Sequence, residues 1–320
     1  MIIFIAANNP EFSSARIRLL THYNYMKSIG IDVFWYTNGS GYIPTLKSGK
    51  HIAYFQKCFS KEHISLAKNL KKRGFRIVYD LSDIVPPGCE NWKGTNAMLR
   101  IMHAGTACSW PMVGWMDARI SMMEMEKPVY YIPDAIEPHN FGAKTHIGDD
   151  PVIGWYGFAK SFDRFVFPMM YVFSQYKNFF IFNQDPNFPQ HVPDRKWDYK
   201  TWQTSVHANI DIGICPLPLD NPNVQSKSCH KVNAFLSMGI PVIASPITEY
   251  LFPLEAGGMT AMKPDGWRMC IEHLFPAKNR RIMGYNGYRR VNKHYSVERL
   301  NTYLLKYLSG DVKPPDLQWR

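Results

Sequence analysis

The sequence predicts an α/β protein built on parallel, doubly wound sheets. Short β-branched segments, such as 1–7 and 31–36, alternate with segments whose apolar residues recur at helical spacing, such as 14–29. Repetition of strand, helix and strand is typical of a parallel sheet that helices cover on both faces. At 320 residues the chain has the length of about two domains, each large enough for its own core.

The N-terminal half supplies the first set of alternating elements. In chain order we expect strand 1–7, helix 14–29 ending at Gly30, strand 31–36, strand 51–56, a helix around 64–72 and strand 75–80. A polar segment with two glycines and paired aspartates, 141–150, predicts a domain boundary. The second sheet is expected to begin at Val152, and the chain to end with an amphipathic helix over 297–308.

The clearest βαβ unit combines buried strands at 210–214 and 240–245 with a helix from about 229 to 238. Ser228 is expected to cap the start of this helix, and Gly239 to end it in the left-handed conformation. Strands covered on both faces read as continuous apolar runs, which is the pattern of both segments.

Two lysines flank the start of that helix. Lys227 and Lys231 stand in the loop and first turn after strand 210–214. In open α/β sheets ligands bind beyond the carboxyl ends of the strands, where loop amides and helix N-termini attract anions. The sequence therefore predicts a phosphate or diphosphate site here, against the alternative that both lysines lie on a solvated helix face.

This unit resembles the donor-binding core of GT-B glycosyltransferases, in particular the large retaining family that uses nucleotide sugars. The matching positions are Asp211, Ile212, Gly213, Pro216, Lys227, Lys231, Gly239, Pro241, Val242, Ala244 and Ser245. Segments 13–18, 130–137 and 153–157 are also similar to elements of that family. Ser226 and Ala234 depart from it, because they replace two glutamates that usually hold hydroxyls of the donor.

The resemblance implies two Rossmann-like domains that face a cleft. Residues 1–145 would form the acceptor-side domain, and residues 146–295 the domain that binds the nucleotide sugar. Residues 296–320 would be a C-terminal helix and tail that cross back to the first domain. The implied co-substrate is a UDP-sugar or another nucleotide sugar, with no bound cofactor and no metal.

The same resemblance implies the donor-binding residues. They are Gly157, Lys160, Lys227, Ser228, Lys231 and Ser226, with Arg164 as a further cation near Lys160. Departure of a nucleoside diphosphate builds negative charge, which fixed cations in a water-poor site stabilise. For Lys160 and Arg164 we favour the alternative interpretation, in which both are solvated cations on a helix, over a role in donor binding.

Three residues are candidates for catalysis. Asp80 and Asp83 follow a strand, where a carboxylate is placed to bind the acceptor or take its proton, although Asp83 equally fits a turn cap before Pro86. Arg16 begins the first helix and is expected near donor phosphate or acceptor, whereas Arg18 points elsewhere and is expected to be structural. Retention of the anomeric configuration is implied by the resemblance; inversion would require one aspartate as base.

Charge is the main clue to the acceptor. The net charge of +11 favours an anionic partner, and cations alternate with aromatics in 194–202 and 280–290. Such mixtures suit nucleic acid or a lipid surface. We favour transfer to a hydroxymethylated pyrimidine in DNA, because size and charge resemble phage-type DNA-modifying enzymes. The alternatives are a surface-glycan or lipid-linked acceptor, and a non-catalytic nucleic-acid-binding protein.

The sequence further predicts a cytoplasmic protein with reduced cysteines. No segment approaches the roughly 18 apolar residues of a membrane span, and the N-terminus reads as a strand. Six cysteines show no paired spacing typical of zinc sites or disulfide frameworks.

Overall fold

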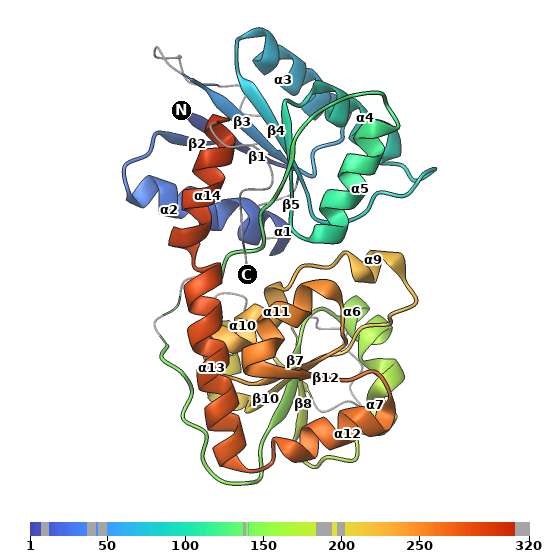
Figure 1. The fold of residues 1–320 in the computed structure, drawn as a ribbon, viewed down its shortest axis with the longest axis vertical. Coiled ribbons are helices and arrows are strands. Elements are labelled where there is room, and N and C mark those ends of the chain that lie inside the picture. The colour runs from blue at the N-terminus through green and yellow to red at the C-terminus, as the bar shows by residue number, and fades with distance from the viewer. Residues whose placement is uncertain are drawn as a thin grey trace. The chain divides into compact units, whose positions relative to one another are not determined.

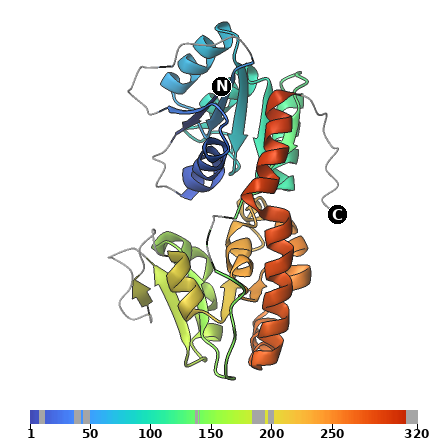
Figure 2. The ribbon, with the colours of Figure 1, turned by 90° about the vertical axis from the view of Figure 1, so that its left-hand side faces the viewer.

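The computed structural model describes residues 1–7, 13–36, 43, 50–136, 139, 141–183, 194–196 and 202–310. The chain forms two compact units, each a sheet with helices on both faces (Figures 1 and 2). Unit 1 comprises Met1–Glu137, Ser226–Ser228 and Tyr295–Arg320; unit 2 comprises Pro138–Gln225 and Cys229–His294. All strand pairs recorded in both sheets are parallel, so the predicted α/β class with two parallel sheets is confirmed.

Unit 1 contains a six-stranded sheet in the order β2-β1-β3-β4-β5-β6. Its strands are β1 (Ile2–Ala6), β2 (Val33–Tyr36), β3 (Ile52–Gln56), β4 (Arg76–Leu81), β5 (Ala104–Ala107) and β6 (Val129–Tyr131). Its helices are α1 (Ser13–Ala15), η1 (Arg16–Leu20), α2 (Thr21–Ser28), α3 (Lys61–Lys72), α4 (Trp92–Ile101), α5 (Trp110–Ser121) and α14 (Val297–Ser309).

The two faces of this sheet have separate cores. On one face Phe4 and Tyr54 pack with Leu304 and Tyr307 of α14, which lies beside α2 in Figure 1. On the other face the side chains of α3, α4 and α5 cover Ile5, Phe55, Ile77 and Tyr79. Because neighbouring residues of a strand point to opposite faces, this alternation fixes which strand-end side chains share a face.

The first helix departs from the prediction of one regular helix over 14–29. Arg16–Leu20 form a π-helical turn, in which the Thr21 N–H bonds to the Arg16 carbonyl. The Thr21 hydroxyl donates to the same carbonyl over 3.0 Å. Such turns inside helices are frequent at functional sites, and Leu19 of this one packs in the core against the sheet.

Unit 2 contains a second six-stranded sheet, in the order β12-β11-β10-β7-β8-β9. Its strands are β7 (Ile153–Tyr156), β8 (Phe179–Asn183), β9 (Asp194–Lys196), β10 (Ile212–Cys215), β11 (Val242–Ala244) and β12 (Gly258–Thr260). Its helices are α6 (Ala159–Phe165), η2 (Phe167–Met169), α7 (Met170–Phe173), α8 (Trp202–Asn209), α9 (Pro222–Gln225), α10 (His230–Ser237), α11 (Thr248–Gly257), α12 (Pro264–His273) and α13 (Ala277–Tyr295).

The βαβ unit predicted over 210–245 is present as β10, α10 and β11, with one correction. Ser228 does not cap α10: Cys229 is the N-cap residue, and no side-chain hydrogen bond caps the helix. Gly239 ends the helix with φ of +74°, as predicted. A Cβ at Gly239 would lie 2.5 Å from the Lys144 backbone nitrogen, so close packing also requires glycine there.

Strand order reverses once in each sheet. In unit 1 the chain passes from β1 outward to β2 and then returns to the other side of β1 with β3. In unit 2 it passes from β7 outward to β8 and β9 and returns with β10 on the other side of β7. The carboxyl ends at such switch points, β1/β3 and β7/β10, are where open α/β sheets bind ligands.

Three further features bear on the expectations from sequence. All six cysteines are unpaired, and five of them are buried. Within the described ranges no group of three or more His, Cys, Asp or Glu is placed to hold a metal ion. In the same ranges no helix combines the length and apolar character needed to cross a membrane.

Candidate functional site

Gly157 and Lys231 meet at the switch point of unit 2. Lys231 lies in the first turn of α10, and its ammonium donates to the Tyr156 carbonyl over 2.7 Å, at the end of β7. The same ammonium lies 4.1 Å from the ring centroid of Trp155. The sequence-based expectation that both residues share one site therefore has a geometric basis.

Only glycine fits at position 157. A Cβ there would lie 2.4 Å from the indole of Trp155 and 3.2 Å from the Lys231 ammonium nitrogen. Trp155 is 1% exposed and belongs to the apolar core of unit 2, so its ring has little room to move. Because glycine has no side chain, an anionic ligand can approach the backbone at position 157 next to the Lys231 ammonium.

Lys160 and Arg164 are placed differently. Both side chains are exposed on the short helix α6. The Arg164 guanidinium lies 5.6 Å from the ring centroid of its neighbour Phe165. A donor contact by Lys160 stays a prediction.

Ser226, Lys227 and Ser228 form a short segment that belongs to unit 1, although the residues on either side of it belong to unit 2. We call Ser226–Ser228 the anchored segment. Three hydrogen bonds hold it: Ser109 Oγ to the Ser226 carbonyl (2.7 Å), Lys227 Nζ to Asp83 Oδ1 (3.1 Å), and Ser228 Oγ to Asp134 Oδ2 (2.5 Å). The hydroxyl of Ser228 thus bonds a carboxylate in unit 1 and not the amides of α10.

Asp83 is shared by two lysines. Besides Lys227, it accepts a hydrogen bond from Lys57, and its side chain is 44% exposed. Partial burial acts to raise its pKa, but the two ammonium groups outweigh this and hold the pKa of Asp83 below its usual range. Two cations and one anion leave the cluster with a net positive charge, which suits an anionic ligand.

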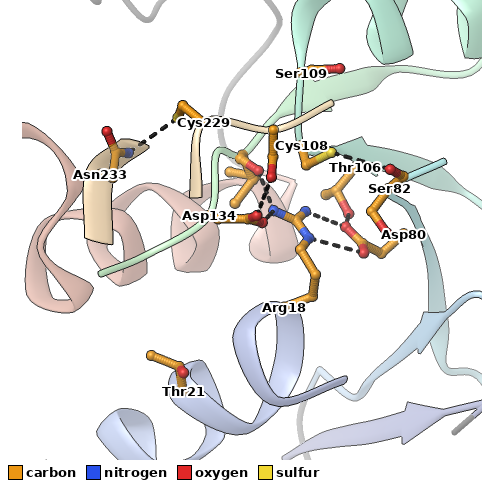
Figure 3. Close-up of polar contacts among 12 residues, drawn as sticks. Arg18, Thr21, Asp80, Ser82, Thr106, Cys108, Ser109, Asp134, Cys229 and Asn233 are labelled. Carbon is orange, nitrogen blue, oxygen red and sulfur yellow. Dashed lines mark hydrogen bonds and ion pairs between the residues drawn. The ribbon is translucent and has the colours of Figure 1, made fainter. Parts of the chain in front are cut away.

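Asp80 has a different environment (Figure 3). It is fully buried and forms a two-point ion pair with Arg18, one hydrogen bond of which measures 3.2 Å. Thr106 and Tyr54 donate to the same carboxylate over 2.8 and 3.2 Å. With both oxygens occupied and no exposure, Asp80 does not fit the predicted role of acceptor ligand or base. It is a structural partner of Arg18.

Arg18 joins two carboxylates of unit 1. Its guanidinium also contacts Asp134 at 3.1 Å and donates to the Ile132 carbonyl. Burial alone would lower the pKa of Arg18, but the charge of Asp80 and the other partners raise it, so the residue stays a cation. Asp134 in turn accepts a hydrogen bond from Ser228, so Arg18 supports the anchored segment through one intermediate carboxylate.

Arg16 is half-buried in the π-helical turn, two residues before Arg18. Arg18 is committed to buried carboxylates, in line with the structural role expected of it. The role of Arg16 at donor or acceptor stays a prediction.

Sequence reasoning missed Lys57 and Asp134. Lys57 directly follows β3, and its φ of +52° is unusual for a residue with a side chain. A search for chemistry at the carboxyl end of every predicted strand would have found it. Asp134 lies in the segment 130–137 named above, but only the fold shows that it accepts a hydrogen bond from the hydroxyl of Ser228.

Two of the four arginines in 280–290 are committed to contacts within unit 2, whereas Arg281 and Arg289 are exposed, so a nucleic-acid surface here stays a prediction. Arg280 is fully buried and donates to the carbonyls of Leu274, Phe275 and Gly148. Arg290 pairs with Glu255. These two arginines stabilise the packing of α13. Of the other basic and aromatic segment, 197–201 and the side chains of 194–196 lie outside the described residues.

Comparison with known proteins rests on structure. No protein-family model and no curated protein matches the sequence. Among solved structures, a glycosyltransferase from Rickettsia africae ESF-5 is similar with a TM-score of 0.66 and 11% identity, covering 98% of each chain. Anabaena Alr3699/HepE in complex with UDP-glucose gives a TM-score of 0.63 and 10% identity, covering 97% of this chain and 100% of that one.

A third similar structure is an alpha-glucosyltransferase in complex with UDP-glucose and DNA containing an abasic site. Its TM-score is 0.65 with 12% identity, and 96% of this chain and 98% of that chain are covered. At such identities the likeness concerns the fold, and the two-domain fold expected from the resemblance to GT-B glycosyltransferases is confirmed.

Proposed function

We propose that this protein is a glycosyltransferase that moves a sugar from a nucleotide-sugar donor to a hydroxyl acceptor. The observation that carries the proposal is the pairing of Gly157 with the Lys231 ammonium at the switch point of unit 2. The similar solved structures that contain UDP-glucose support it, because they show that proteins of this fold bind such a donor.

Lys231 is assigned to the diphosphate of the donor. Its ammonium already lies against a backbone carbonyl and an indole, so it is oriented before any ligand arrives. A fixed cation stabilises the charge that develops on a departing diphosphate without reorganising during the reaction. The bare backbone of Gly157 lets that diphosphate approach closely.

Lys227 is proposed as a second donor cation, and Asp83 as the residue that orients it. Asp83 is the more accessible of the two candidate carboxylates, but its lowered pKa makes it a weak proton acceptor. Its two ion pairs suit the holding of Lys57 and Lys227 better than base catalysis. Ser226 and Ser228 would act through their backbone, since their hydrogen bonds fix the anchored segment.

Hydroxymethylated pyrimidine in DNA is the acceptor we favour. The net charge of +11 supports an anionic acceptor, and a similar solved structure holds DNA together with UDP-glucose. A base inside a duplex must be turned out to reach the donor, which is the usual strategy of enzymes that modify bases. A surface glycan or lipid-linked sugar is the alternative acceptor.

Intact-mass analysis tests the reaction directly. Hydroxymethylated and ordinary duplex DNA are incubated with the protein and a panel of nucleotide sugars. A pentose or hexose increment confined to the hydroxymethylated duplex is the expected result. If DNA gains no mass and a glycan or lipid-linked sugar is modified instead, that sugar is the acceptor. DNA binding without any donor binding would identify a nucleic-acid-binding protein and exclude the transferase.

A donor-only assay tests the assignment of Lys231. Hydrolysis of the nucleotide sugar without acceptor should fall about 100-fold or more in Lys231→Ala. Lys278→Ala is the matched control, because Lys278 is an exposed lysine on a helix of the same unit. Equal rates in the two variants would remove Lys231 from the donor site.

A further inference from the structure

A buried glutamine, Gln56, lies at the switch point of unit 1. Gln56 is the last residue of β3 and pairs in register with Ala6 at the end of β1 and with Asp80 on β4. Residues in register point to the same face of a parallel sheet, so Gln56 shares the face of Tyr54 and Asp80. It therefore occupies the position in unit 1 where the topology predicts a ligand.

The side-chain amide of Gln56 has no hydrogen-bond partner within the described part of the chain. The side chain is fully buried, yet neither its Nε2 nor its Oε1 is bonded. More than nine in ten buried polar groups in native proteins are satisfied, and an unsatisfied one destabilises the fold. Its neighbour Asp80 shows the contrast, because that carboxylate accepts hydrogen bonds from Arg18, Thr106 and Tyr54.

A second, independent observation lies one residue further on. Lys57 has a backbone φ of +52°, a region that residues with side chains enter rarely and chiefly at functional sites. Its N–H bonds to the Asp80 carbonyl over 3.1 Å, and its ammonium shares Asp83 with Lys227. The strand end therefore carries an unpaired amide beside surplus positive charge.

We infer that Gln56 is an acceptor-binding residue and that its amide bonds the edge of a nucleobase. This inference rests on the proposed function and names the part of the acceptor that is recognised. A primary amide offers one donor and one acceptor side by side, the pattern that glutamine uses on base edges. A phosphate would instead require a cation, which Lys57 supplies next to it.

Burial of the amide distinguishes a base from an extended glycan. Because the side chain of Gln56 is fully buried, only a small, flat group can reach its amide. A base turned out of its duplex has this form, and its bonds to a pocket replace those lost on unpairing.

The test uses the full-length Gln56→Met variant, which keeps the length of the side chain and removes the amide. Three quantities are measured: the urea midpoint of unfolding, donor hydrolysis without acceptor, and binding of a fluorescent hydroxymethylated duplex by anisotropy without donor. We expect an unchanged or higher midpoint, unchanged donor hydrolysis, and DNA binding weakened roughly tenfold or more. A side chain that merely fills the core would not combine higher stability with weaker binding.

Tyr79→Phe is the matched control. The hydroxyl of Tyr79 is likewise buried without a hydrogen-bond partner among the described residues, but its side chain lies in the core on the opposite face. It should gain stability without changing DNA binding. Equal DNA binding by Gln56→Met and wild type would overturn the inference, as would transfer by the wild type to a glycan alone.

The inference and the proposed function fail in different ways. If wild-type protein hydrolyses no nucleotide sugar, the transferase is lost, yet the comparison of DNA binding between wild type and Gln56→Met still decides the role of Gln56. If donor hydrolysis is present and the variant binds DNA normally, the proposed transferase function is retained and Gln56 has no role in binding the acceptor.

Discussion

Replacing Arg18 with methionine is expected to destabilise unit 1 by about 3–5 kcal/mol. The guanidinium is 2% exposed and lies between Asp80, which is fully buried, and Asp134, which is 5% exposed. Methionine keeps much of the side-chain volume but removes every hydrogen bond to these two carboxylates. The loss is large because the variant leaves buried negative charge without its counter-charge, which is costlier than losing a pair outright.

A double-mutant cycle separates the interaction energy of Arg18 with Asp80 from the rest of the stability lost in Arg18→Met. Asp80→Asn removes one buried charge and keeps an amide of similar shape, so it should relieve part of the penalty in Arg18→Met. A coupling energy of about 1–3 kcal/mol is expected for residues in one such network. Tyr54 and Thr106 still donate to the asparagine oxygen, so the second substitution introduces little new strain.

Urea unfolding at neutral pH, followed by circular dichroism and fluorescence, measures these energies in the four proteins of the cycle. Since Asp134 holds Ser228, the anchored segment should also become more accessible, which hydrogen exchange over 226–228 reports. A loss below about 1 kcal/mol in Arg18→Met, with unchanged exchange at 226–228, would refute the view that this buried network supports the segment.

Three other outcomes are expected. Gly157→Ala should lower stability by about 1–3 kcal/mol and weaken nucleotide binding in calorimetry, because its Cβ would lie 2.4 Å from Trp155; full nucleotide affinity would contradict the donor assignment. Burial lowers the pKa of His22 to about 4, below its unfolded value, so stability should fall as pH drops from about 6.5 to 4; urea midpoints should fall less in His22→Leu, and an equal fall would exclude His22 as the cause. Asp83→Asn should raise the KM for donor and change kcat less than tenfold if this carboxylate orients lysines; a loss of kcat of about 1000-fold with normal donor binding would instead make it the base.

The architecture was largely predictable because it rests on local patterns. Strands covered on both faces appear as short apolar runs, and the strands predicted at 1–7, 51–56 and 75–80 correspond to β1, β3 and β4. Gly239 predicted the end of a helix, because glycine readily adopts the positive φ that it has there. The π-helical turn at Arg16–Leu20 was not predicted, and the turn contains the buried Arg18, whose carboxylate partners lie far away in the sequence.

The site was predictable only for residues that follow neighbouring parallel strands, because the carboxyl ends of such strands lie at the same edge of the sheet. Gly157 and Lys231 follow β7 and β10, so the carboxyl-end rule brings them together. Asp80 and Asp83 looked equivalent in sequence, but Asp80 lies within β4 and Asp83 lies beyond its end. Asp80 therefore pairs with Arg18, and Asp83 pairs with two lysines. Ser228 was expected to cap a helix because cap residues are recognised by local spacing, whereas its partner Asp134 lies 94 residues away.

The placement of α14 has a consequence for biosynthesis. A chain made from its N-terminus completes all six strands of unit 1 long before residues 297–309 emerge, yet Leu304, Tyr307 and Leu308 of that helix cover one face of the sheet. Until then Phe4 and Tyr54 lack part of their cover, and the nascent domain presents an apolar surface that invites chaperone binding or aggregation. Helix α14 therefore closes unit 1 only after the strands of unit 2 have been translated, and unit 1 reaches its final stability no earlier than that.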